Sequence, residues 1–198
     1  LKGFYIFIAC IALGVAAIAS VGSVSRSLVN GISEEGQAIL GGDLAFSLIH
    51  RQVDETELAF LASLGRVSEI ATLRAMARNG DDTSQTLVEL KAVDGAYPLF
   101  GDIEIEGGGN LDDLIAERDE TYGLVAEAGL AERLGIKVGD SVSIGEKTFP
   151  LTGLIASEPD RLSGGLGWGP RVILSISALK TTGLPQPGSR VRWRSRVP

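Results

Sequence analysis

The sequence predicts an α+β fold, in which one N-terminal transmembrane helix with a stalk extension leads into a mixed, mostly antiparallel sheet domain. The first observation is that Phe4 to Val24 forms a run of 21 residues without a charge, an amide or a proline. The second is an apolar stripe that continues from this run to Leu40. The third is the alternation of short strand-like and helix-like runs in the remaining chain, an order typical of helices on one face of an antiparallel sheet.

The run from Phe4 to Val24 is long enough to cross a bilayer. A helix rises about 1.5 Å per residue, so this run spans roughly 31 Å, about the thickness of the hydrocarbon core. Its small residues let another helix approach closely, and Tyr5 suits the headgroup layer. A cleaved secretory signal is the alternative, because Lys2 gives a short positive region and residues 17–19 (AIA) have the shape of a cleavage site. The length of the run and its helical continuation favour a retained anchor.

After this run, the sequence predicts a helical stalk. Leu28, Ile32 and Ile39 fall on one side of a helix, and polar residues fill the other side. Gly41-Gly42 provides a C-terminal cap. A flexible linker would be rich in glycine, serine and proline, and this segment is not. The expected division of the chain is residues 1–24 for the transmembrane helix, 25–41 for the stalk and 42–198 for the sheet domain.

Alternation, turn residues and capping signals predict the elements of the sheet domain. Acidic residues at positions 54, 55 and 57 open a helix, because negative charge is favourable at a helix N-terminus. Turn residues at 81–84 join two strand-like runs into a hairpin. The expected strands are residues 43–49, 67–78, 86–93, 102–106, 122–126, 141–144, 148–155 and 172–176, the last in the centre of the sheet. The expected helices are residues 54–64, 111–117, 128–134 and 177–182.

Closely spaced strands between residues 122 and 160 predict a small β-rich, barrel-like or sandwich subdomain. Two glycine-rich loops flank these strands. The first, at residues 107–110, lacks the GK[ST] of a phosphate-binding loop and is interpreted as an ordinary loop. The second, at residues 158–171, is long and carries Trp168.

The charge distribution separates an acidic body from a basic tail. Residues 34–160 contain all 25 acidic residues and nine of the 18 basic ones, a formal charge of −16. Residues 161–198 carry seven basic residues and no acidic one. The acidic body argues against nucleic acid as a partner, because phosphate binding needs a basic face. We expect the basic tail either to pair with the acidic body or to approach anionic headgroups.

The residues that carry chemistry make no case for an enzyme. The single cysteine, Cys10, lies in the apolar run, and the single histidine, His50, has no GxSxG nucleophile to serve. Glu158 and Asp160 are a candidate carboxylate pair, but residues two apart beside a proline usually cap and bond the backbone. Arg161 would also keep both ionised, which is wrong for a general acid. We therefore predict no catalytic site, cofactor or metal.

Arginines alternate with other residues near the end of the chain. Arg190, Arg192, Arg194 and Arg196 share one face of a strand, because side chains along a strand repeat with a period of two. Our interpretation is a half-buried strand whose outer face is charged and solvated. The alternative is a charged strip that faces lipid headgroups or a partner.

Several segments together resemble a known family, namely LGGDLAF after the stalk, VDGAYPLFG, LAERLGIKVGDSVSIG and EPDRLSGGLGWGPRV. They are similar to the first transmembrane helix and periplasmic core domain of the MacB-like, FtsX-related permeases of bacterial ABC transporters, especially the YbbP-like branch. The order of EPDR and GPR after the VGD turn is the most specific feature. The residues that carry the family pattern are Gly41, Gly42, Asp43, Asp94, Tyr97, Pro98, Gly139, Asp140, Glu158, Pro159, Asp160, Arg161, Gly169, Pro170 and Arg171.

The resemblance implies a non-catalytic permease subunit in the bacterial inner membrane, with the residues after the helix in the periplasm. It implies that a separate ABC ATPase drives motion that the permease couples to the periplasmic handling or export of a lipophilic substrate. Other transmembrane helices of the same permease, the membrane and a periplasmic partner are further expected contacts. The later spans and the coupling loop of a full permease are not in this sequence, so we interpret it as an excerpt. The alternative is a membrane-anchored or secreted binding module outside any transporter.

Overall fold

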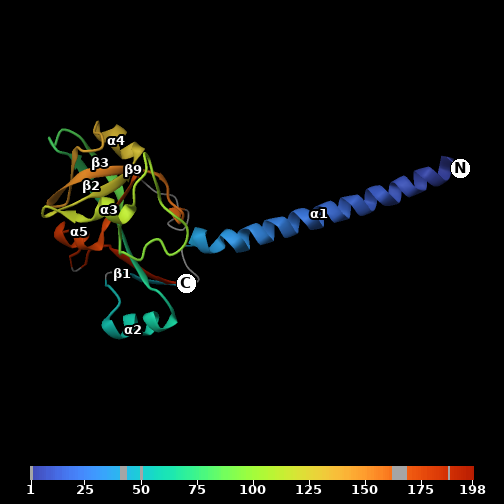
Figure 1. The fold of residues 1–198 in the computed structure, drawn as a ribbon, viewed down its shortest axis with the longest axis horizontal. Helices are drawn as coiled ribbons and strands as arrows, with labels where there is room; N and C mark the ends of the chain where they lie inside the picture. Colours follow the sequence, from blue (N-terminus) through green and yellow to red (C-terminus); the bar gives the residue numbers. More distant parts are fainter. Residues whose placement is uncertain (1, 41–43, 50, 162–168, 187) are drawn as a thin grey trace. The chain divides into compact units, whose positions relative to one another are not determined.

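The computed structural model contains one long N-terminal helix and a sheet domain with short helices around it (Figure 1). It describes residues 2–40, 44–49, 51–161, 169–186 and 188–198, with the backbone alone at residues 2–3, 9 and 28–40. By its internal contacts the chain divides into two compact units, residues 1–37 and residues 38–198.

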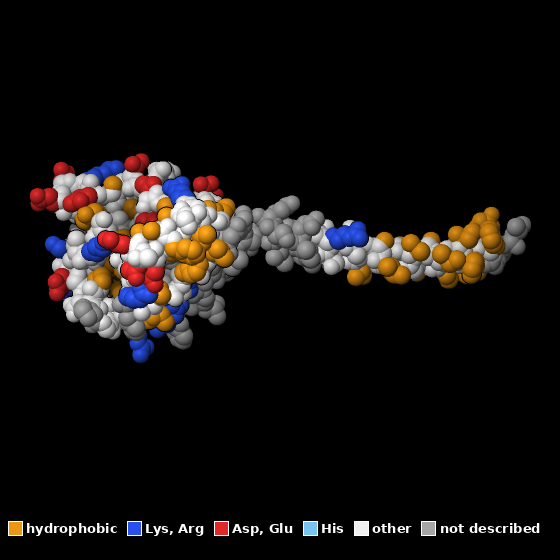
Figure 2. All heavy atoms as spheres, turned by 90° about the horizontal axis from the view of Figure 1, so that it is seen from below, with side chains coloured by type: hydrophobic (Ala, Val, Ile, Leu, Met, Phe, Trp, Pro, Cys, Tyr) orange, Lys and Arg blue, Asp and Glu red, His pale blue; other side chains and the backbone are white. Residues whose placement is uncertain are grey.

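Helix α1 runs without interruption over Lys2–Leu40, so the predicted continuation beyond the apolar run is helical. Residues Phe4–Ser27 have the length and composition of one membrane span, with a mean hydropathy of 2.5. The apolar side chains described in this span are exposed, and Figure 2 shows hydrophobic side chains along it. A helix that is apolar on all sides and has no protein cover fits lipid better than water. The predicted cap at Gly41-Gly42 lies outside the described residues.

The domain is built on one nine-stranded sheet with the order β1-β11-β2-β3-β10-β7-β9-β4, in which β8 pairs with both β2 and β9. Among the described strands of this sheet, only the β3–β10 and β7–β9 pairs are parallel, so the sheet is mixed and mostly antiparallel, as predicted. The strands are β1 (Leu44–Ile49), β2 (Ser68–Asn79), β3 (Gln85–Val93), β4 (Glu104–Ile105), β7 (Leu124–Glu127), β8 (Ser141–Ile144), β9 (Lys147–Ser157), β10 (Arg171–Ser175) and β11 (Arg192–Val197).

Six of these strands close into a ring. Each of β2, β3, β10, β7, β9 and β8 pairs with the next, and β8 pairs back with β2. Closure gives the backbone groups of these strands a partner on both sides. Residues 122–160 supply β7, β8 and β9, and the other three strands come from outside that segment. The boundary of a separate β-rich subdomain therefore stays a prediction.

Among the described residues, four short helices accompany the sheet, and the start of the first follows its predicted signal. The side chain of Asp54 accepts a hydrogen bond from the Glu57 backbone N–H at 2.8 Å, and Glu57 accepts one from the Asp54 N–H at 2.9 Å. This reciprocal capping box fixes the start of the first of the four. Gly135 ends the third in a left-handed conformation. The helices are α2 (Glu55–Leu64), α3 (Leu111–Ile115), α4 (Ala128–Leu134) and α5 (Ile176–Thr181).

The end of α3 differs from the prediction. The helix ends at Ile115 rather than at residue 117, and residues 117–118 form β5 (Glu117–Arg118) instead. β5 pairs with β6 (Thr121–Tyr122) in a small separate sheet. The turn between them places Asp119 and Glu120 at positive φ values of 50° and 61°, which the sequence pattern did not indicate.

The predicted strand 122–126 is divided at Gly123. A Cβ atom at this position would lie 1.9 Å from the carbonyl oxygen of Leu114, so only glycine lets α3 approach this backbone. The predicted strand 102–106 is shorter than expected, because only Glu104–Ile105 pairs with β9. Both differences arise from tertiary contacts that a local pattern does not contain.

The two faces of the ring strands differ in composition. Along β3, Val88, Leu90 and Ala92 belong to the larger apolar cluster, which fills the interior of the ring and includes residues of α4 and α5. Lys91 and Val93 point to the opposite face, which we call the outer face. A smaller apolar cluster lies there, made of Ile70, Val93, Tyr97, Ile105, Leu111, Ile115, Val125, Ile155 and Ile173. Charged side chains, among them the buried Lys91, Arg171 and Arg196, lie beside this cluster.

Candidate functional site

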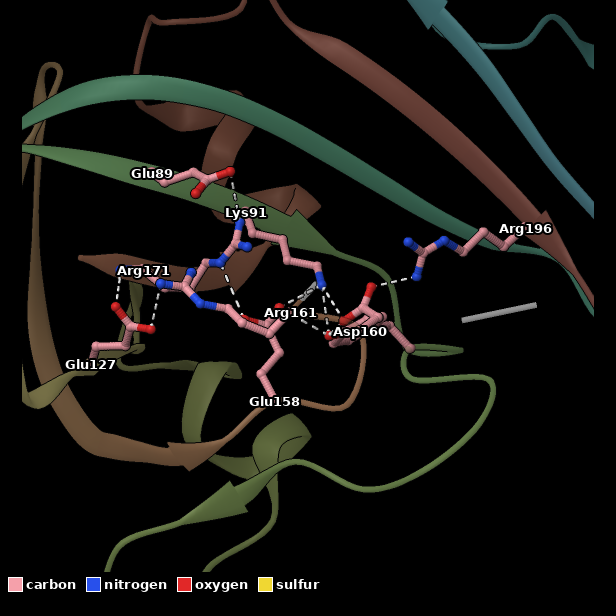
Figure 3. A network of polar contacts seen from close by, with 9 residues as sticks. Glu89, Lys91, Glu127, Glu158, Asp160, Arg161, Arg171 and Arg196 are labelled. Atoms are coloured by element: carbon pink, nitrogen blue, oxygen red, sulfur yellow. Dashed lines mark hydrogen bonds and ion pairs between the residues drawn. The ribbon is translucent and has the colours of Figure 1, made fainter. Parts of the chain in front are cut away.

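A network of charged side chains, buried at its centre and partly exposed at its edge, lies on the outer face, beside β3 and β10 (Figure 3). Its members come from β3, β7, β10 and β11, and from residues 158–161 after β9. Four are cationic and four anionic, so their formal charges cancel. They are Lys91, Arg161, Arg171 and Arg196 with Glu89, Glu127, Glu158 and Asp160.

Lys91 is the centre of this ion network. Its Nζ donates to Glu158 Oε1 at 2.7 Å, to Asp160 Oδ1 at 2.8 Å and to the Tyr97 hydroxyl oxygen at 2.7 Å. Lys91 is only 3% exposed. An ammonium group has three donors and each has a partner here, which is the condition for burying such a charge.

Asp160 receives bonds from three sides. The Tyr97 hydroxyl donates to its Oδ1 at 2.6 Å, Lys91 bonds the same oxygen, and Arg196 Nη1 bonds Oδ2. Burial alone would raise the pKa of Asp160, but the charge and hydrogen bond of Lys91, with the bonds from Tyr97 and Arg196, hold that pKa well below its usual range. Asp160 is therefore a fixed anion.

Burial and the neighbouring carboxylates also shift the pKa values of the two donors, Lys91 and Tyr97. Burial lowers the pKa of Lys91, while the attraction of Glu158 and Asp160 opposes that change. Burial, and then the two carboxylates, raise the pKa of Tyr97 far above its ordinary value. Tyr97 consequently stays a neutral hydrogen-bond donor to Asp160.

Arg171 extends the network along β10. Its Nε lies 3.2 Å from Glu158 Oε2, and its Nη1 lies 3.2 Å from Glu89 Oε1 on β3. Its backbone N–H donates to Glu127 Oε2 at 2.8 Å. The other oxygen of Glu127 pairs with Arg161 Nη2 at 2.7 Å. Residues 158–161 are thus held against four strands, β3, β7, β10 and β11, by directional, charge-assisted bonds.

The partners of Glu158 and Asp160 go beyond the expectation. We expected these carboxylates to cap and bond the backbone, and the structure shows them bonded to the side chains of Lys91, Arg171 and Arg196, which that expectation did not include. We also expected Arg161 to hold them ionised, and instead it pairs with Glu127. Local spacing could not indicate partners that lie many residues away in the chain.

The alternating arginines are not one uniform face. Arg192 is exposed and Arg194 half-buried, while Arg196 is buried at 3% exposure against Asp160. The interpretation of a solvated outer face is therefore wrong for Arg196. Pairing of the basic tail with the acidic body is confirmed for Arg161, Arg171 and Arg196.

Asp94 fixes the end of β3 to the start of β2. Its carboxylate accepts from the Ser68 hydroxyl at 3.0 Å, the Glu69 N–H at 2.6 Å and the Ala96 N–H at 3.1 Å. These bonds lie just before Tyr97, whose bond to Pro98 is cis. Asp94 thereby orients the segment that brings the Tyr97 hydroxyl to the network.

Other family-pattern residues shape loops. Asp140 accepts from the Lys137 N–H at 2.9 Å, and the Gly139 N–H donates to the Leu151 carbonyl at 2.8 Å, which forms the turn before β8. A Cβ at Gly169 would lie 2.3 Å from the Leu87 carbonyl oxygen, so this glycine lets the chain enter β10 close beside β3. The Pro170 carbonyl then accepts from the Glu89 N–H at 3.1 Å.

The remaining residues of the pattern are placed as follows. Pro159 separates the two network carboxylates Glu158 and Asp160, whereas Gly41, Gly42 and Asp43 lie outside the described residues. His50 and Trp168 lie outside them too. Most of the described pattern residues thus converge on the network or on turns next to its strands.

The sequence pattern missed several members of the network, namely Glu89, Lys91 and Glu127. A signal was present, because Glu89 and Lys91 alternate with Leu90 and Ala92 inside an otherwise apolar strand. Within the described residues, no group of three or more His, Cys, Asp or Glu side chains is placed to hold a metal ion. The arrangement can fix distant segments to one another, and Asp160, as a fixed anion, has no proton to donate.

A solved structure of low sequence identity shares this fold. The extracellular domain of the noncanonic ABC-type transporter YknZ from Gram-positive bacteria matches with a TM-score of 0.51 and 17% identity, over 73% of each chain. The periplasmic region of MacB from Actinobacillus actinomycetemcomitans matches with a TM-score of 0.49 and 12% identity, over 81% of this chain and 77% of that one.

A sequence relative and a family model match nearly the whole chain. YbbP, an ABC transporter permease of Escherichia coli (strain K12), is 28% identical over 185 residues, which are 93% of this chain and 22% of the relative's length. The chain thus spans less than a quarter of that protein. The model of the MacB-like periplasmic core domain matches residues 5–195. With its candidate membrane span and its mixed sheet, the chain belongs to the MacB-like periplasmic core domain family of ABC transporter permeases.

Proposed function

We propose that this chain is the first membrane span and the periplasmic core domain of an ABC transporter permease, and that it carries motion from the membrane into the domain. The observation behind the proposal is the continuity of α1, which is one helix from the candidate span to Leu40. Only three residues separate its end from the start of β1. A helix transmits displacement along its axis, whereas a glycine-rich linker would absorb it.

The proposed division assigns residues 1–24 to the inner membrane, residues 25–41 to a stalk and residues 42–198 to the periplasm. The family and the permease relative support a non-catalytic subunit that works with a separate ATPase and with further membrane helices. The proposed task is the periplasmic handling or export of a lipophilic substrate. The proposal includes no cofactor.

Within the domain, the bonded strands offer a route for this motion. β1 pairs with β11 along its whole length, from Leu44 opposite Val197 to Ile49 opposite Arg192. On β11, Arg196 bonds Asp160, which bonds Lys91 on β3. A displacement of β1 would thus reach residues 158–161 and the ring through backbone bonds and the ion network.

The test is a proline in the proposed stalk of the full-length permease that contains this chain. Ile32→Pro removes a backbone donor and clashes with the preceding turn, at a cost of about 3 kcal/mol or more of helix stability. We expect the variant to insert and fold, to hydrolyse ATP with its ATPase, and to lose export. The measurement is ATPase activity and substrate release, side by side, in proteoliposomes.

Ile32→Ala is the matched control, because alanine keeps the helix and removes only side-chain atoms. It should retain most export. If the proline variant exports as well as the alanine variant, the stalk does not carry motion and the mechanical role is wrong.

A further inference from the structure

Two arginines of β11 stand apart from the ion network. Arg192 is exposed and Arg194 is half-buried on the same face of the strand. Residues two apart in a strand lie about 6.6 Å from each other, so the two guanidinium groups are close enough to approach one small anion from two sides. We call Arg192 and Arg194 the arginine pair.

The arginine pair has no counter-ion among the described residues. Every cation of the network pairs with a carboxylate. Within the part of the chain that the structure describes, the guanidinium groups of Arg192 and Arg194 have no ion pair and no hydrogen bond. Burial and the neighbouring charges of Arg196 and Arg192 lower the pKa of Arg194. This local excess of positive charge stands out in a chain with a net charge of −7.

Hydroxyl groups and one apolar side chain border the arginine pair. In the strand register Ser47 lies opposite Arg194, and Thr72 lies opposite Arg192. On the other side of Arg192 is Ile49, which is 58% exposed. Paired residues of neighbouring strands point to the same face, so two guanidiniums, two hydroxyls and an exposed apolar group share one surface.

We propose that the arginine pair binds the phosphate group of an anionic lipid. Guanidinium groups bind phosphate oxygens with two parallel bonds, and the Ser47 hydroxyl adds a further donor. The exposed Ile49 favours a phosphate that carries an acyl chain over free phosphate. The candidate span in α1 places this chain at a membrane, whose anionic lipids attract basic side chains near the surface. This inference goes beyond the proposed function and does not rest on it.

The test uses the full chain of residues 1–198 in a neutral detergent. Native mass spectrometry measures retention of dioleoylphosphatidylglycerol, with dioleoylphosphatidylcholine as the reference for lipid that α1 holds without selectivity. Each arginine near an anionic surface contributes a factor of about five in affinity. We expect Arg192→Gln and Arg194→Gln each to reduce the preference for the anionic lipid by about that factor.

Arg133→Gln on α4 is the matched control, because it removes the same charge from an exposed residue that is not on β11 or its neighbouring strands. It should leave the preference unchanged. Arg192 is exposed, so its variant tests the proposal even if Arg194→Gln loses stability. Equal lipid preference in the wild type and Arg192→Gln would overturn the proposal. Displacement of the lipid by an equal concentration of inorganic phosphate would assign the pair to free phosphate and overturn the lipid assignment.

Discussion

The interior of the strand ring and its outer face are both buried, but different forces hold them. The interior is filled by aliphatic side chains such as Leu90, Leu151 and Leu174, whose contacts have no preferred direction. The outer face is closed by charges that need specific partners, with Lys91 and Asp160 at the centre. Equal burial therefore does not mean equal tolerance of substitution. An apolar site accepts another apolar group of similar volume, whereas loss of one buried ion leaves another uncompensated.

The largest expected effect is that of Lys91→Met. Methionine has a similar volume but leaves Glu158 and Asp160 without their shared cation. Breaking a buried ion pair in this way costs about 3 to 5 kcal/mol. We expect the free energy of unfolding to fall by that amount. Urea unfolding of the full chain in detergent, followed by tryptophan fluorescence, measures it.

Leu90→Met is the matched control for this variant. It places the same new side chain at the adjacent residue, which points into the ring interior. A volume-conserving apolar change costs less than about 1.5 kcal/mol. Similar losses at positions 90 and 91 would contradict the contrast between the two faces.

A smaller effect is expected from acid. Because the folded-state pKa of Asp160 is lowered, its contribution to stability is complete above the unfolded-state pKa of about 3.9 and is lost as the pH falls toward the folded-state value. Stability should therefore fall more steeply below about pH 4 in the wild type than in Asp160→Asn. Urea midpoints between pH 5 and pH 2.5 measure this, and parallel curves would show that Asp160 is not the titrating group.

The smallest effect is expected at an exposed polar arrangement, the capping box of α2. Asp54→Ala removes the acceptor for the Glu57 N–H at the first turn. Loss of an N-cap costs about 0.5 to 2 kcal/mol. Urea unfolding should show a loss below that of Lys91→Met. A larger loss would mean that surface caps, rather than buried ions, dominate the polar contribution to stability.

The sequence was sufficient for elements whose signal is local. The uninterrupted apolar run predicted the first part of α1. Alternation and turn residues predicted the bounds of β2, β3 and β8 to within a residue or two, and the bounds of α4 were predicted as closely. The central position of β10 followed from its continuous apolar run. These elements could be predicted because the apolar residues that each one buries recur with a helix or strand period in its own sequence.

The candidate site was harder to predict from the sequence, because the residues that bond one another in it are far apart in the chain. Lys91 meets Asp160 across 69 residues, and Arg196 meets Asp160 across 36. The resemblance singled out the EPDR and GPR segments, but it did not show that Lys91 and Glu127 complete the network. The turn at Asp119 and Glu120 was also missed, because no sequence pattern marks these acidic residues as having positive φ.

If interdependent charges hold the outer face, the effects of Lys91→Met and Asp160→Asn should not be additive, and a double-mutant cycle measures this. The two groups bond each other at 2.8 Å. The double variant should lose less stability than the sum of the two single variants. Each single variant leaves one buried charge without its partner, whereas the double variant removes both charges of the pair. We predict a coupling energy of more than about 1 kcal/mol in urea unfolding. Losses that add to within about 0.5 kcal/mol, as independent sites do, would contradict the account.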